Sequence, residues 1–72
     1  MSFYTDQKKA LTALDKVLDS AYKDKSNVDI DALIYEILKN HAVSPSSIRK
    51  QIERYAKTRN VVIKDDIMEM NR

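Results

Sequence analysis

The chain has 72 residues, a formal net charge of +2 and no cysteine. This length allows one domain with a single small core, and we expect that domain to span residues 1–72. So short a chain buries only about 60% of the surface that it exposes when unfolded. The absence of cysteine excludes disulfides and thiolate metal sites as sources of stability.

Glycine is absent and the only proline is Pro45. This composition favours helices and argues against tight primed hairpins and glycine-rich phosphate loops. No apolar run approaches the roughly 20 residues that cross a membrane, and the N-terminal segment lacks the basic-then-apolar order of a secretory signal. We therefore expect a mainly helical protein that stays in the cytoplasm and does not associate with membranes.

The first predicted helix covers residues 5–22, with Thr5 as its N-cap and Asp6 at the positive end of the helix dipole. Its apolar residues recur at helical spacing and form a broad stripe: Ala10, Leu11, Leu14, Val17, Leu18 and Ala21. The stripe is wider than one partner helix requires, which makes helix 5–22 a candidate homodimer surface. The alternative is that it only covers the other helices of the same chain. The polar segment 23–27 is predicted to be a loop.

The second predicted helix ends at about Asn40 and begins after a cap at Asn27 or Asp29. Its large aliphatic residues follow the helical template throughout: Ile30, Leu33, Ile34, Ile37 and Leu38. Five such side chains on one face must be buried, so this helix is expected to form the centre of the core. Val28 could instead end a very short strand.

The third predicted helix covers residues 45–58. Ser44 is a suitable N-cap, and Pro45 suits the first helical position because its missing N–H is not needed there. Its inward face is expected to carry Ile48, Ile52, Tyr55 and Ala56. The connection from the second helix is so short that the two helices must be neighbours in space.

The tail, residues 61–70, permits two interpretations. The β-branched run 61–63 favours a strand, and Asp65 and Asp66 could turn the chain so that residues 67–70 pair back as a second strand. The same two aspartates could instead begin a last helical turn. We favour the hairpin.

One segment resembles the turn and recognition helix of helix-turn-helix DNA-binding domains. It is Ala42-Val43-Ser44-Pro45-Ser46-Ser47-Ile48, followed by Ile52, and the resemblance extends from roughly Ile34 to Tyr55. It implies that helix 45–58 is a recognition helix and that Asn40 or Ala42 adopts a positive φ in the turn. The order helix, helix, helix, hairpin resembles the winged-helix variant of the family, in which the hairpin is the wing.

The charge distribution is consistent with a polyanionic partner. Residues 45–72 hold seven basic and four acidic residues, a net of +3, whereas residues 1–44 hold six basic and seven acidic residues, a net of −1. With the apolar face of helix 45–58 turned inward, its other face would present cations to a DNA groove. The predicted DNA-binding residues are Ser46, Ser47, Arg49, Lys50, Gln51, Arg54, Lys57, Arg59 and Lys64.

These residues have different expected roles. The two serines reach phosphates or base edges, residues 49–51 read bases, and the later cations contact the DNA backbone. A domain this small offers few base contacts, so a homodimer reading two half-sites is expected. The predicted function is therefore that of a transcriptional regulator or other DNA-associated factor.

Nothing in the sequence indicates catalysis. His41 is the only histidine and stands at the end of the second helix, where it suits the negative end of the dipole. We expect no enzyme activity, no cofactor, no metal and no small-molecule substrate. The alternative function is a three-helix protein–protein adaptor or a small subunit of a larger complex, which would bind duplex DNA weakly or not at all.

Overall fold

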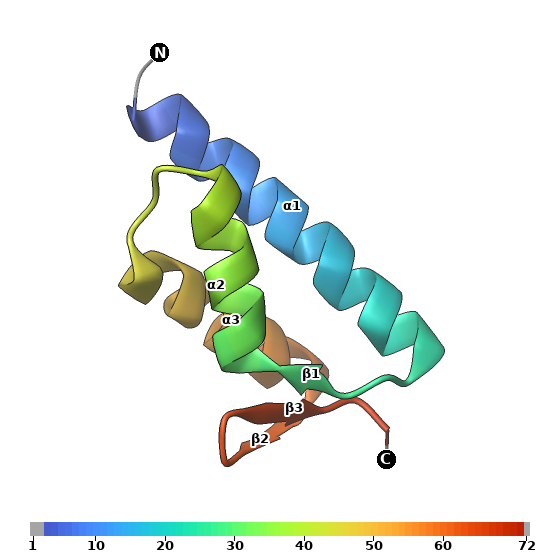
Figure 1. Ribbon diagram of the computed structural model, residues 1–72. Coiled ribbons are helices and arrows are strands. Elements are labelled where there is room, and N and C mark those ends of the chain that lie inside the picture. The colour runs from blue at the N-terminus through green and yellow to red at the C-terminus, as the bar shows by residue number, and fades with distance from the viewer. Residues whose placement is uncertain (1–2, 72) are drawn as a thin grey trace.

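The computed structural model describes residues 3–71, with side chains from residue 6 onward. In chain order the elements are α1 (Phe3–Asp24), β1 (Val28–Asp29), α2 (Ile30–Asn40), α3 (Pro45–Arg59), β2 (Val62–Lys64) and β3 (Ile67–Glu69). The three helices pack together, and the small sheet lies at the end of the molecule opposite the start of α1 (Figure 1). This confirms the predicted fold class, a mainly α protein with a helical core and a C-terminal hairpin, here called the wing (residues 62–69).

Helix α1 is longer than predicted at both ends. Thr5 already has helical backbone, because the helix begins at Phe3, so the prediction that Thr5 is the N-cap is wrong. At the other end Lys25 adopts a left-handed φ of 57°. The Lys25 N–H donates to Tyr22 O and the Ser26 N–H to Ala21 O, the Schellman pattern that satisfies the last carbonyls of a helix. The predicted loop therefore begins only after Asp24.

The start of α2 settles the choice between two caps in favour of Asp29. Its carboxylate accepts a hydrogen bond from the Ala32 N–H at 3.2 Å, as an N-cap side chain should. Asn27 instead accepts a hydrogen bond from the Asn71 N–H at 3.0 Å. The short strand ending near Val28 is also present, since Val28 and Asp29 pair with β3.

The sheet is antiparallel with the strand order β1-β3-β2. Lys64 is opposite Ile67, so the wing turns through Asp65 and Asp66 alone, and these residues have φ of 54° and 60°. A two-residue turn with two left-handed residues has the type I′ pattern, which aspartate tolerates better than most residues. The hairpin prediction is confirmed and the helical alternative is wrong, as is the expectation that a chain without glycine avoids such turns.

The core lies between the helices and one face of the sheet. Side chains that are fully enclosed come from α1, α2, α3 and β3: Leu14, Leu18, Ile30, Ile48, Ile52 and Met68. Most of the apolar stripe of α1 is therefore used inside the chain, although Val17 remains 45% exposed. None of the helices within residues 3–71 is both long and apolar enough to cross a lipid bilayer.

The connection between α2 and α3 differs from the one that the family resemblance implies. Its backbone is extended at His41 and again at Ser44, and neither Asn40 nor Ala42 has a positive φ. Glycine is thus not required, because the extended residues span the gap while Val43 is buried beneath them. Ser44 occupies the N-cap position as predicted, but its hydroxyl lies 2.8 Å from that of Ser46 and makes no cap hydrogen bond.

Truncation of Ile52 should destabilise the chain strongly. Its side chain is fully buried, so Ile52→Ala is expected to lower the free energy of unfolding by about 2–5 kcal/mol, and the gentler Ile52→Val by about 1 kcal/mol. Val62→Ala, at a position 39% exposed, should cost less than about 1 kcal/mol. Urea unfolding followed by circular dichroism measures all three, and equal losses for the two alanine variants would contradict the described core.

Candidate nucleic-acid interface

The surface of α3 that faces away from the core, its outward face, carries three cations that have no ion-pair partner in the described part of the chain. The inward position of Ile48 and Ile52 fixes the rotation of the helix, so the outward face consists of Ser46, Lys50, Glu53, Arg54 and Lys57, all exposed. Within residues 6–71, no ion pair joins Lys50, Arg54 or Lys57 to a carboxylate. With Glu53 as its single acid, this face has a net charge of +2.

One edge of α3 faces α2 and the wing, and Arg49 lies there with its charge already paired. Its guanidinium is 3.1 Å from the Asp31 carboxylate, in the first turn of α2, and 3.4 Å from the Asp66 carboxylate in the wing turn. The three side chains are 40%, 68% and 55% exposed, so each pair contributes at most about 1 kcal/mol. Arg49 was predicted to read bases, and the structure instead places it as a link between three elements.

The opposite edge of α3 packs on α1, and two more of the predicted DNA-binding residues are used there. Gln51 is partly buried and its amide donates to the Asp15 carboxylate at 3.2 Å. The Arg59 guanidinium lies 3.8 Å from the centre of the Tyr55 ring and 3.8 Å from an oxygen of Asp19. Gln51 and Arg59 therefore hold α3 on α1.

Tyr55 is the buried member of this α1–α3 contact. Its hydroxyl donates to the Asp19 carboxylate at 2.5 Å. Burial of the ring, followed by this hydrogen bond, raises the pKa of Tyr55 to about 12, while the nearby Arg59 charge acts in the opposite direction. The fold therefore favours the protonated phenol, which is the form that can donate to Asp19.

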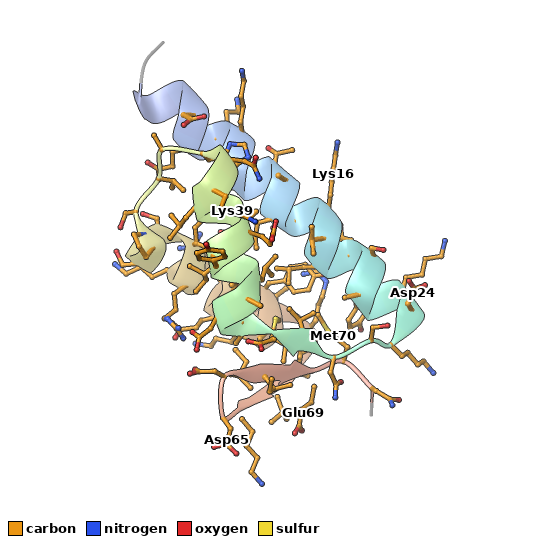
Figure 2. All side chains as sticks on the ribbon, in the orientation of Figure 1. Lys16, Asp24, Lys39, Asp65, Glu69 and Met70 are labelled. Atoms are coloured by element: carbon orange, nitrogen blue, oxygen red, sulfur yellow. The ribbon has the colours of Figure 1, made fainter. Side chains whose placement is uncertain are left out.

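The wing carries Lys64 in acidic surroundings. Lys64 is exposed at the end of β2, directly before the exposed Asp65 and Asp66. Figure 2 shows Asp65 at the tip of the wing. Arg49 is shared between Asp66 and Asp31, and Lys64 and Asp65 offset each other, so the tip has no net positive charge.

Two hollows lie along the crevice between α1 and α3. The first, here called the basic hollow, has a volume of about 190 Å³ and is lined by Gln7, Leu11, Ser47, Lys50, Gln51 and Arg54. The second, the acidic hollow, is of similar size and is lined by Asp15, Asp19, Gln51, Arg54, Tyr55, Thr58 and Arg59. Sequence reasoning missed Gln7, because only the packing of α1 beside α3 brings it near Ser47 and Lys50.

His41, which follows the last residue of α2, lies beside a carboxylate of α1. Its Nδ1 lies 3.6 Å from the Asp6 carboxylate, which also accepts a hydrogen bond from the Ala42 N–H. That histidine nitrogen is buried and makes no hydrogen bond within the described part of the chain. Asp6 and His41 thus join the start of α1 to the connection before α3.

The predicted site residues other than Arg49, Gln51 and Arg59 separate into three groups. Ser46, Lys50, Arg54 and Lys57 share the outward face, Ser47 lines the basic hollow, and Lys64 lies apart on the wing. No protein-family model, curated protein or solved structure matches the chain. Its function must therefore be inferred from the charge and exposure of its own side chains.

Alkaline pH should selectively weaken the contact of Tyr55 with α1. Because the folded pKa of about 12 exceeds the ordinary value of 10.0, the stabilisation is fully present below pH 10 and lost as the pH rises towards 12. Tyr55→Phe cannot ionise, so the stability advantage of the wild type over this variant should shrink by about 2 to 3 kcal/mol across that range. Urea unfolding at stepped pH measures the difference, and a constant difference would contradict the described contact.

Proposed function

We propose that the chain binds double-stranded DNA, with α3 as its recognition helix, and acts as a transcriptional regulator or other DNA-associated factor without catalysing a reaction. The observation that carries this proposal is the exposure of Lys50, Arg54 and Lys57 on one helix face, where no carboxylate of residues 6–71 pairs with them. Unpaired cations on a rigid face attract phosphates and release counterions on binding.

The shape of the molecule supports the same function. An α-helix fits the major groove of B-DNA when one side is free of other elements. On its outward face, α3 has the short side chain of Ser46 near its start and long cationic side chains one to three turns later. Glu53, which lies between these cations, could accept a hydrogen bond from the amino group of cytosine.

The expected affinity is modest. Arg49, Gln51 and Arg59 contact the protein's own acids, which leaves three cations on the outward face. Each phosphate that a cation neutralises makes the plot of log K against log salt steeper by about 0.9. Three contacts therefore predict a slope of about −3, with weak binding to random sequence.

Two arginine variants test the proposal with the same change of side chain. Arg54→Ala removes a cation of the outward face, whereas Arg49→Ala removes one that is paired with Asp31 and Asp66. We expect Arg54→Ala to weaken binding to random duplex by about fivefold and to reduce the salt slope by about 1. Arg49→Ala should change the affinity by less than about twofold.

Fluorescence anisotropy of a labelled duplex at about 50 and about 150 mM salt measures both quantities. Urea unfolding of each variant checks that the fold is retained. If the wild type does not bind duplex at the lower salt concentration, or binds with no salt dependence, the DNA-binding proposal is wrong. The protein–protein adaptor then becomes the better hypothesis.

A further inference from the structure

The two halves of the crevice between α1 and α3 differ in charge: the basic hollow has two cations and no acid, whereas the acidic hollow has two acids and two arginines. The basic hollow contains Lys50 and Arg54, the hydroxyl of Ser47 and the amide of Gln7, but no carboxylate. Gln51 also lines it, with its amide directed to Asp15. Hydroxyl and amide donors beside two cations are suitable ligands for one phosphate group. The volume of about 190 Å³ is sufficient for such a group without displacement of the backbone.

The acidic hollow is a poorer site for a phosphate, because carboxylates line it. Asp15 and Asp19 both line it. Of the two arginines that also line it, Arg59 contacts Asp19 and Arg54 is shared with the basic hollow. A DNA strand that crosses from α3 to α1 would therefore encounter repulsion near Asp19, and it would cross at the end marked by Gln7 and Ser47.

The basic surface continues from this hollow onto α1. Lys8 precedes Leu11, which lines the basic hollow, by three residues, so these two residues are neighbours on the surface of α1. Lys8 is exposed, and it lines a shallow apolar hollow together with Lys9 and Lys16. Figure 2 shows Lys16 projecting from α1 away from the rest of the molecule. No ion pair joins these three lysines to a carboxylate within residues 6–71.

The wing offers a weaker path for the same strand. Its turn contains Asp65 and Asp66, and Lys64 is the single cation within β2, β3 and their turn. Repulsion from Asp65 offsets the attraction of Lys64 for a phosphate. Arg49, the nearest cation on α3, already contacts Asp66.

We infer that the basic hollow binds a phosphodiester group of the DNA backbone, and that the strand continues from there over Lys8 on α1 and not over the wing. This inference rests on the proposed DNA-binding function and specifies the side of α3 along which the strand runs. It assigns Gln7 and Lys8 to the interface, although both lie outside the basic C-terminal segment.

Two matched lysine variants distinguish the paths. Lys8→Ala should weaken binding to a labelled random duplex by about fivefold and reduce the salt slope by about 1. Lys64→Ala removes the same side chain from the wing and should change the affinity by less than about twofold. Both positions are exposed, so neither substitution is expected to unfold the chain, and urea unfolding checks this.

A substitution that raises the affinity is a second test of the hollow, because a misfolded variant would lose affinity. Gln7→Lys adds a cation to the basic hollow and should strengthen binding by about threefold or more, with a slope steeper by about 1. Ser26→Lys adds the same charge beyond the far end of α1, at an exposed position outside the hollow, and should have less effect.

The outcomes separate this inference from the proposed function. If the wild type binds duplex but Lys64→Ala weakens binding more than Lys8→Ala does, the strand follows the wing and the inference is wrong while DNA binding stands. Equal effects of Gln7→Lys and Ser26→Lys would also overturn the inference, because they would indicate a response to net charge alone. Absence of wild-type binding would instead refute the proposed function.

Discussion

The rotation of α3 about its own axis is the constraint on which the remaining surface depends. Ile48 and Ile52 are fully buried one turn apart, and a buried isoleucine cannot turn outward without losing about 2–5 kcal/mol of stability. This fixes Lys50 and Arg54 towards solvent and the α1 side, and Arg49 towards Asp31 and Asp66. The core thus determines which cations are free and which are neutralised.

The chain achieves its sharp turns without glycine. Lys25, Asn60, Asp65 and Asp66 all have positive φ, a conformation that costs a residue with a Cβ atom about 1 kcal/mol. Hydrogen bonds offset that cost at the helix ends. The Val61 N–H donates to Ala56 O at 2.8 Å after α3, and the Ser26 N–H donates to Ala21 O at 2.9 Å after α1. Because these residues have side chains, the unfolded chain has less conformational entropy than it would have with glycine at the same positions. This favours the folded state.

Local patterns were sufficient to predict most of the fold and little of the interface. The apolar spacing of α2 and α3, the cap position of Ser44 and the wing could be predicted, because each depends on residues close in sequence. The choice between Asn27 and Asp29 as the cap of α2 could not, because Asn27 contacts Asn71 at the other end of the chain. Partners such as Asp31 for Arg49 and Asp15 for Gln51 lie in other elements, 18 and 36 residues away. Periodicity identifies the exposed side of a helix, but not the acids that neighbouring helices bring to its edges.

The turn of the wing is held by two helices at once. The Asp66 carbonyl accepts the Ile30 N–H at 2.9 Å at the start of α2, and its carboxylate contacts Arg49 on α3. The hairpin therefore cannot swing as a separate flap while α2 and α3 stay in place. A partner that approached α3 would meet a preorganised surface, so little conformational entropy would be lost in ordering the wing.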